Sequence, residues 1–426
     1  MEGTTFAVHT DKINKLTIMA FRKFINDPVH GFITINDPLI YEIISHPWVQ
    51  RLRRINQMAM SYLVYPGAVH SRLHHALGAY HLMGSALHEL KQKGIEITDE
   101  EEQAAKIAIL LHDVGHGPFS HALESILVKD LEHEAISLLI MESLNAKMEG
   151  TLSMAIEIFK GTYEKKFLHQ LISGQLDVDR MDYLTRDSFF SGVIEGTIGC
   201  DRILKMLTVH RGELMVEEKG IYSIENFLVA RRLMYWQVYQ HKTVLSAEMT
   251  LVKILERAIW LFNNGDEKIS SDNTIGKLLF DRNRQIEPSF LEMFCSLDDS
   301  DVLSEIKKWK HHTDIVISTL SNALLNRNLL KLRIQNEPIE AKELEEKRAE
   351  VSTQLGISKE DAQYLVFKGE AENSIYNPFN EKINVLYKDG SVKDISQVDN
   401  PLIHQNLSQT VKKFYISFYK THKKPS

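Results

Sequence analysis

Residues able to bind a metal or move a proton are concentrated between positions 110 and 121 of this 426-residue chain. The stretch reads LLHDVGHGPFSH, and it holds four such side chains: His112, Asp113, His116 and His121. An apolar run at 107–111 precedes it, and glycine and proline follow the His-Asp pair. Because glycine and proline do not continue a helix, we predict a buried helix that ends at this pair and a turn that faces the same spot.

The His-Asp pair suits a metal ion. Neutral imidazole and carboxylate together bind Mn, Fe, Ni, Zn or Mg. Adjacent side chains within a helix point about 100° apart, so His112 and Asp113 converge on one ion only at a helix end. In many proteins such a pair is only an ordinary hydrogen-bonded surface pair. Here the preceding apolar run indicates burial, which is costly for an unpaired charge, so a metal site is the favoured interpretation.

Two other segments offer further ligands. The segment HSRLHHALG contains His75, which on its own is typical of a packed histidine. The segment DVDRMDYLTRD interleaves aspartates with apolar residues, a pattern that indicates partial burial. Its Asp179, Asp182 and Tyr183 are spaced to share one helical face. A part-buried aspartate from this segment is therefore a candidate metal ligand.

Other charged residues admit two interpretations. His133 and Glu124 are either proton-transfer groups or members of a solvated helix face. The arginines at 51–54 are either exposed or partners of an anionic ligand. Spacing alone does not distinguish these alternatives.

The elements that position these residues are mainly helical by their periodicity. A capping signal at Thr98, followed by acidic residues, marks the start of the central helix. Helices are predicted at 38–60, 68–90, 98–111, from 132 onward, at 224–262, in parts of 270–335 and, as a solvated helix, at 337–355. Short strands are predicted at 30–35, at 207–210 and 213–216 around Arg211-Gly212, and at 382–395 around Asp389-Gly390.

Composition excludes several classes of protein. The net charge of −7, with 43% hydrophobic and 25% charged residues, is typical of an ordinary globular protein and gives no indication of a nucleic-acid partner. Cys200 and Cys295 make no disulfide framework, so we expect reduced thiols and a cytoplasmic location. Charges interrupt the first twenty residues and no apolar run is long enough to span a bilayer, so neither a signal peptide nor a membrane segment is expected.

Taken together, six ordered segments resemble the HD-domain phosphohydrolases, and more closely their dNTP triphosphohydrolase (dGTPase-like) branch. The segments are RLRRINQM, HSRLHHALG, HDVGHGPFSH, HEAIS, DVDRMDYLTRD and YQHK. The resemblance implies a mainly α fold, an HD-domain helical bundle with small β-hairpins and a mixed C-terminal region. We expect a leader at 1–22, the HD core at 23–265, and a C-terminal helical region at 266–426 that ends in a small α+β piece.

The resemblance also implies a ligand set and a proton relay. The family holds its metal with two histidines and two aspartates, which match His75, His112, Asp113 and Asp179. The implied catalytic residues, which contact phosphate or carry protons, are His116, His121, Glu124 and His133. Glu124 stands where the family usually has aspartate, and it is one methylene longer.

Further positions resemble substrate and effector residues. Those matching the substrate site are Gln57, Arg72, Arg180, Tyr183, Asp187, Arg231 and Tyr239; Arg180 replaces a lysine. Tyr239 would pack where a ribose 2′-hydroxyl would clash. Some family members are dimers or tetramers activated by nucleotides bound between subunits, and the positions resembling that second site are Lys23, Asn26, Gln50, Arg53, His241 and Lys242. Ser45 stands where a guanine-reading aspartate is expected, which argues against strict activation by GTP.

Three functions follow from these patterns. The first is metal-dependent hydrolysis of a deoxynucleoside triphosphate to deoxynucleoside and tripolyphosphate. The second is another HD phosphohydrolase activity, on a nucleoside monophosphate or a cyclic or alarmone nucleotide. The third is a non-catalytic nucleotide sensor. The products released from each nucleotide distinguish among them.

Overall fold

A computed structural model describes residues 21–128, 131–270, 273–280, 288–373, 376, 382–398 and 411–420. Across these ranges the fold is mainly α-helical with small sheets, as the sequence predicted. The predicted leader lies outside the described residues except for positions 21 and 22. Among the described residues, no helix has the length and apolar character needed to cross a membrane. Both cysteines are free, as expected.

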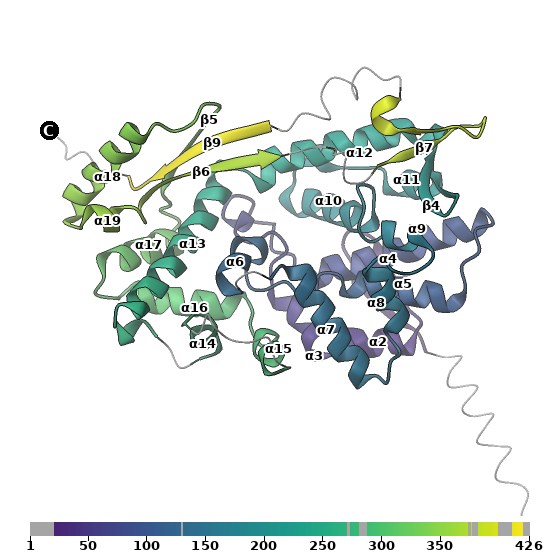
Figure 1. The fold of residues 1–426 in the computed structure, drawn as a ribbon, viewed down its shortest axis with the longest axis horizontal. Helices are drawn as coiled ribbons and strands as arrows, with labels where there is room; N and C mark the ends of the chain where they lie inside the picture. The colour runs from purple at the N-terminus through teal and green to yellow at the C-terminus, as the bar shows by residue number, and fades with distance from the viewer. Residues whose placement is uncertain are drawn as a thin grey trace, which may run out of the picture.

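Three helices form the centre of the first half: α4 (Arg72–Gln92), α5 (Asp99–Leu111) and α10 (Val178–Ser191). Helix α4 packs against both of the others (Figure 1). Helix α5 begins at the predicted cap, where Thr98 Oγ1 accepts from the Glu101 amide at 3.2 Å and the Glu101 carboxylate accepts from the Thr98 amide at 2.9 Å. It ends at Leu111 with His112 as its C-cap, so the predicted helix end is confirmed.

Gly78 permits the close packing of α4 on α10. A Cβ atom at this position would lie 2.0 Å from the Asp182 carboxylate and 2.1 Å from the Arg186 guanidinium. Any larger residue would therefore displace a buried ion pair.

The first part of the chain holds further helices. They are α2 (Pro38–Ser45), α3 (Pro47–Gln50), α6 (Glu124–Leu127), α7 (His133–Lys147), α8 (Ser153–Phe159), α9 (Lys166–Gln170), α11 (Cys200–Met206), α12 (Ile221–Met234) and α13 (Lys242–Asn263). The helix expected from residue 132 is confirmed as α7.

Two long predicted helices are interrupted. The stretch 38–60 is interrupted at His46, which has an extended backbone, because Pro47 starts a new helix. A 3-10 turn follows at Arg51–Arg54, and the backbone is no longer helical at Ile55. Within the stretch 224–262, α12 is followed by a π-helical turn at Tyr235–Tyr239. His241 then adopts ψ 129° and its ring accepts the Thr243 amide, which starts α13.

The strands form three sheets within the described ranges. Strands β1 (Lys23–Asp27) and β2 (Gly31–Ile35) form one hairpin. A second sheet has the order β3-β4-β7-β8, from β3 (Leu207–His210), β4 (Glu213–Glu217), β7 (Asn384–Leu386) and β8 (Val392–Asp394). The third has the order β5-β9-β6, from β5 (Lys331–Gln335), β6 (Val366–Asn373) and β9 (Val411–Phe418). The predicted hairpins at 207–216 and 382–395 are confirmed, whereas a strand at 331–335 was not expected.

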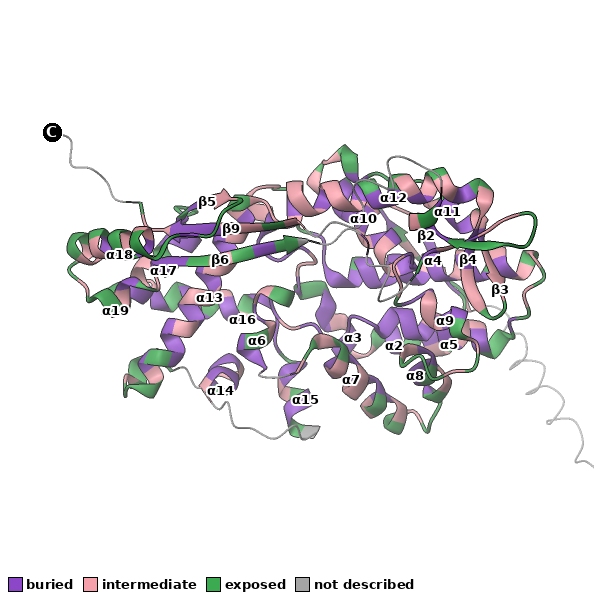
Figure 2. Ribbon diagram, turned by 45° about the horizontal axis from the view of Figure 1, so that its top comes forward, coloured by how far each residue is buried: buried purple, intermediate pink, exposed green. Residues whose placement is uncertain are grey.

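The remaining helices belong to the C-terminal part: α14 (Thr274–Phe280), α15 (Pro288–Phe294), α16 (Asp299–Trp309), α17 (Ile315–Leu325), α18 (Ala341–Leu355) and α19 (Lys359–Ala362). Helix α13 packs against α17 and β5. Figure 2 shows that α18 is largely exposed, and it buries only Leu344 and Val351, as predicted for a solvated helix. Because β7 pairs in parallel with β4, the chain returns from its C-terminal part to the first half. The domain boundary at 265 stays a prediction.

Candidate active site

The ends of three helices bring four polar side chains together. His75 lies on α4, His112 and Asp113 follow the end of α5, and Asp179 lies in the first turn of α10. Asp179 Oδ1 is 3.0 Å from His75 Nε2 and 3.3 Å from His112 Nε2. The Asp113 carboxylate is 3.4 Å from His112 Nε2 and 3.8 Å from His75 Nε2. The structure thus gathers all four residues that the resemblance implied as metal ligands, which we call the four-ligand cluster.

The hydrogen bonding of the two imidazoles fits a metal. His75 Nδ1 lies 2.8 Å from Asp182 Oδ2, and His112 Nδ1 lies 2.6 Å from the Ile109 carbonyl. Both Nδ1 atoms are therefore donors, and both Nε2 atoms face the cluster. The two Nε2 atoms are buried and have no hydrogen-bond partner. Metal-binding histidines have this arrangement, with the far nitrogen held by an acceptor. His75, His112 and Asp179 each offer a ligand atom, all within 4.8 Å of one another.

The charges around the cluster also favour a cation. Burial raises the pKa of Asp113, but His112, His116 and Arg72 outweigh it and hold that pKa well below its usual range. Burial lowers the pKa of His75, but Asp179 and Asp182 outweigh it and raise the pKa to about 10. The carboxylates thus attract positive charge, which a bound divalent ion would provide in place of protons.

A buried ion-pair network supports His75 from behind. Asp182 accepts from Arg186 Nε at 2.9 Å and lies 2.7 Å from His30 Nε2, and Arg186 Nη1 donates to Asp27 at 2.7 Å. Asp182 and Arg186 are inaccessible to solvent. Sequence analysis missed the roles of Asp27, His30 and Arg186. The spacing of four residues between Asp182 and Arg186 was the available signal for an ion pair.

Beside the four-ligand cluster lies a second group, the histidine cluster, formed by His116, His121, Glu124 and His133. The His116 and His133 rings stack with centroids 3.9 Å apart, and His121 meets both edge to face. Glu124 lies 3.1 Å from His121 Nδ1 and 2.8 Å from His133 Nδ1. The structure therefore brings together all four residues predicted to be catalytic.

The pKa values within the histidine cluster diverge. Burial lowers the pKa of His116, and Arg72 lowers it further. Burial also lowers the pKa of His133, but the hydrogen bond to Glu124 outweighs it, so that pKa is raised. Burial raises the pKa of Glu124, yet His121 and His133 bring it far below its usual value. One imidazole is thus held neutral, and another holds a proton against a carboxylate.

The loop that carries His116 and His121 has a strained backbone. Phe119 and Ser120 both have positive φ, 54° and 50°, a conformation that costs about 1–3 kcal/mol for each non-glycine residue. Gly115 comes so close to α7 that a Cβ would lie 2.2 Å from the His133 carbonyl. The turn predicted after the His-Asp pair is present, and Gly115 additionally allows a close approach to α7 that the sequence analysis did not predict.

The predicted substrate residues lie on neighbouring elements. The Tyr183 ring is 6.5 Å from His75 and 6.3 Å from Tyr239. Tyr239 Oη donates to Asp187 at 2.7 Å, and the other oxygen of Asp187 is 2.7 Å from His70 Nε2. Asp187 and Tyr239 are thereby fixed against each other beside the four-ligand cluster.

Several positively charged donors near these aromatic residues are buried without a partner. They are Arg180 Nε and Arg231 Nε and Nη1. Burial raises the pKa of Tyr183, whereas Arg180 and Arg231 lower it, so both guanidinium groups lie near that tyrosine. Arg72 instead pairs with Asp113 and donates to Ser120. The acceptor of Gln57 is also buried and unpaired. Buried donors without partners are typical of a site for an anion.

The six predicted effector residues fall into separate groups. Arg53 Nε donates to Gln50 Oε1 at 2.7 Å, and Lys23 and Asn26 lie on β1. Among the described residues, no hydrogen bond, ion pair or ring contact joins these four to His241 or Lys242.

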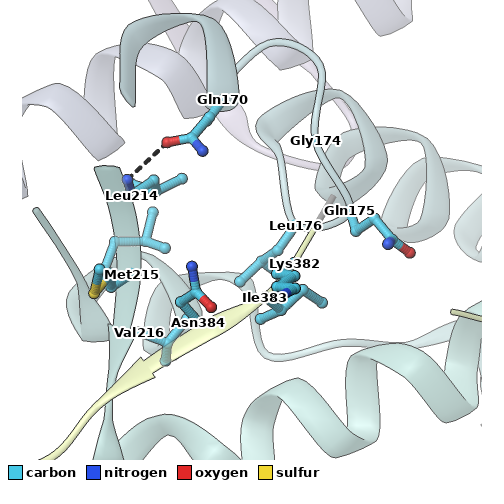
Figure 3. Close-up of a pocket in the computed structure, with 11 residues that line it drawn as sticks. Gln170, Gly174, Gln175, Leu176, Leu214, Met215, Val216, Lys382, Ile383 and Asn384 are labelled. Carbon is cyan, nitrogen blue, oxygen red and sulfur yellow. Dashed lines mark hydrogen bonds between the residues drawn. The ribbon is translucent and has the colours of Figure 1, made fainter. Parts of the chain in front are cut away.

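One cavity lies away from all of these residues. Figure 3 shows it between β4 and the segment that enters β7, next to the end of α9. Gln170, on its wall, accepts from the Leu214 amide at 2.8 Å. None of the predicted site residues lines this cavity.

Comparison with known families identifies two regions. Residues 72–187 match the HD domain, and residues 198–271 match the HD associated region. The first match runs from Arg72 to Asp187 and so includes all four residues of the four-ligand cluster.

Two relatives are similar over most of the chain, and a third is similar over about half of it. A phosphohydrolase from Bacteroides thetaiotaomicron, known as a crystal structure, is 48% identical with a TM-score of 0.90, over 94% of this chain and 100% of that one. The uncharacterized protein YwfO of Bacillus subtilis is 32% identical over 88% of this chain and 87% of its own length. The human deoxynucleoside triphosphate triphosphohydrolase SAMHD1 is 31% identical over 52% of this chain and 42% of its own length.

Proposed function

Because this chain belongs to the HD-domain phosphohydrolases, we propose that it hydrolyses deoxynucleoside triphosphates to deoxynucleoside and tripolyphosphate with a divalent metal. The observation that carries the proposal is the four-ligand cluster, with two unpartnered imidazole nitrogens directed toward two carboxylates. The similarity to SAMHD1 supports the choice of substrate. The metal is one of Mn, Fe, Ni, Zn or Mg, all of which accept these ligands.

The metal would be held by His75, His112, Asp113 and Asp179. When bound, it would supply charge that polarises a phosphate and favours deprotonation of water. Asp182 and the Ile109 carbonyl hold the ligand imidazoles in the tautomer that leaves Nε2 free.

In the proposed reaction, a water oxygen bonds to the α-phosphorus and the bond from phosphorus to the 5′-oxygen breaks. The departing 5′-oxygen takes a proton, which the histidine cluster supplies. Glu124 orients His121 and His133 through their Nδ1 atoms and stabilises the charged form of His133. His116, the neutral and buried member of the histidine cluster that lies 3.3 Å from Asp113, would contact the phosphate.

Substrate binding would use the buried donors beside Tyr183. The unpaired groups of Arg180 and Arg231 would bind phosphate oxygens. Tyr239, held by Asp187, would stand against the sugar and exclude a 2′-hydroxyl. Gln57 and Asp187 would complete the surroundings of the sugar.

We also propose a homo-oligomer, a dimer or tetramer, with a nucleotide effector bound between subunits. Within the part of the chain that the structure describes, no hydrogen bond, ion pair or ring contact joins Gln50 or Arg53 to His241 or Lys242, which is compatible with a site that a second subunit completes. Because Ser45 stands where the family has a guanine-reading aspartate, we do not expect the effector to be restricted to guanine nucleotides.

The test is a product analysis. Protein loaded with each metal is incubated with each dNTP, each NTP, and pairs of dNTPs, and the products are separated by anion exchange. We expect deoxynucleoside and tripolyphosphate in equal amounts, and slower turnover of ribonucleotides. Release of single phosphates would instead identify another HD phosphohydrolase. Tight binding without any product from any nucleotide would identify a sensor.

A further inference from the structure

A carboxylate from the C-terminal part reaches into the loop of the histidine cluster. Asp299, the first residue of α16, accepts the Phe119 amide with Oδ1 and the Asn56 amide with Oδ2, each at 2.9 Å. Asp299 is buried and Phe119 is inaccessible to solvent. One side chain thus ties two distant segments of the first half to the C-terminal part.

The contact falls on the strained turn. Phe119 is the first of the two residues with positive φ, and Ser120 is the second. Ser120 Oγ accepts from Arg72 Nε at 2.7 Å, and Arg72 also pairs with Asp113. A continuous chain of contacts therefore runs from Asp299 through the turn to the four-ligand cluster.

The other amide held by Asp299 precedes a predicted substrate residue. Asn56 is followed by Gln57, whose amide donates to the His70 carbonyl at 2.9 Å. A second link joins the same elements, because the buried Arg51 donates to the Val114 carbonyl at 2.7 Å and to the Leu297 carbonyl at 3.3 Å. The segment 297–299 thus supports both sides of the site.

The position is costly for a carboxylate. Burial raises the pKa of Asp299 to about 6, although the amides of Asn56 and Phe119 lower it. No basic side chain forms an ion pair with it among the described residues. Burying the Asp299 carboxylate lowers the stability of the fold, so we expect it to be kept because it fixes the positions of the two amides.

We propose that Asp299 is a positioning residue, which holds the turn at 119–120 and thereby sets the histidine cluster and Arg72 in the geometry that the reaction requires. This inference rests on the proposed function of that site. It assigns the C-terminal part a role in catalysis without contact with substrate.

The test compares Asp299→Asn with Asp298→Asn. The first variant offers one acceptor and directs an NH₂ group at the second amide. The control changes the adjacent buried carboxylate, which caps α16 and pairs with Arg54 but does not contact the loop. Asparagine is as good an N-cap as aspartate, so the control should fold normally.

For Asp299→Asn we expect kcat to fall about 10- to 100-fold, because a displacement of about 1 Å can have that effect, while KM and metal content stay near wild type. Asp298→Asn should retain kcat within about threefold. Equal losses in the two variants, or a loss of metal that parallels the loss of kcat, would overturn the proposal.

A spectroscopic measurement separates this inference from the substrate assignment. In protein with ¹⁵N-labelled histidine, Asp299→Asn should shift the ring resonances of His121 and His133, and Asp298→Asn should not. Unchanged His121 and His133 resonances would overturn the proposal whether or not any dNTP is a substrate. If Asp299→Asn fails to fold, Asp299→Glu is measured in the same way. In the wild type the Phe119 amide should exchange slowly with solvent, and fast exchange would count against the contact.

Discussion

The four-ligand cluster and the histidine cluster use the same side chains in different surroundings. The first draws its ligands from three helices, and His75 is inaccessible to solvent. The second lies on a loop, on the short helix α6 and at the start of α7, and the His121 side chain is 69% exposed. A single carboxylate separates them, since Asp113 Oδ1 lies 3.4 Å from His112 Nε2 and 3.3 Å from His116 Nε2.

What distinguishes the two clusters is what lies in front of each imidazole. In the four-ligand cluster, Asp182 and a backbone carbonyl hold the Nδ1 atoms, and both Nε2 atoms face the Asp113 and Asp179 carboxylates. In the histidine cluster, His121 and His133 turn Nδ1 toward the same carboxylate, Glu124, and their rings pack against the ring of His116. The comparison teaches that the groups in front of an imidazole, together with the acceptor behind it, separate a metal ligand from a proton carrier.

The largest effect is expected from His75→Ala. It removes a metal ligand and leaves Asp182 with one fewer partner, so bound metal should be lost and activity should fall about 10⁴-fold or more. Metal stoichiometry and turnover are measured together. The control is His88→Ala, an exposed histidine on the same helix, which should behave as wild type. Full metal content in His75→Ala would contradict the ligand assignment.

His121→Asn should separate the two clusters. We expect activity to fall about 10²- to 10³-fold, the usual contribution of a proton-transfer group, with metal content unchanged. Because His121 is exposed, we expect the variant to fold normally, and a thermal melt tests whether it does. If metal is lost along with activity, the two clusters form one metal site and the comparison fails.

Asp182→Asn tests the acceptor behind His75. The carboxamide is a weaker acceptor, and it weakens the pairs with Arg186 and His30. Metal affinity should fall about 10- to 100-fold, as measured by competition with a chelator. An unchanged Kd would show that the Nδ1 partner does not set the properties of His75.

Glu101→Gln probes a buried carboxylate that has no free imidazole beside it. Glu101 pairs with Lys165 at 2.7 Å and accepts from Tyr163 at 2.8 Å. We expect a loss of about 1–2 kcal/mol in unfolding free energy at neutral pH, with activity and metal content within about twofold of wild type. A large loss of metal would mean that the effects above are not specific to the clusters.

The same variant has a defined pH dependence. Burial raises the pKa of Glu101, but Lys165 and the Thr98 amide outweigh it, so the pKa in the folded protein is lowered. Its contribution to stability is therefore present above the unfolded pKa of about 4.3 and is lost as pH falls through the folded value. Denaturant titrations of both proteins should converge in acid, and a gap that widens there would contradict the assignment.

Local signals accounted for the elements that were predicted well. The cap at Thr98 and the glycines after Asp113 lie within a turn or two of the helix ends that they specify, so α5 was expected where it lies. The turn at Arg211 and Gly212 has positive φ at both residues, as an Arg-Gly hairpin turn suggests. Pro47 was a signal for a helix start that the hydrophobic periodicity of 38–60 masked.

Non-local pairing accounted for what was missed. Strand β5 pairs with β9 across a long stretch of chain, although the alternation of its apolar Leu332 and Ile334 with polar residues was also a local strand signal. Asp299 lies in a segment that was expected only to be helical with loops, and no spacing relates it to Phe119. Asp27 likewise reaches Arg186, and His30 reaches Asp182, only through the packing of the first hairpin against α10.

The sequence by itself determined which side chains could bind a cation or carry a proton, and which short helices present them, because ligand chemistry and capping depend on residues a few positions apart. Only the tertiary structure decided which nitrogen of each histidine is free, and which carboxylate supports it. Those contacts join segments distant in the chain, and their distances depend on how closely the helices pack.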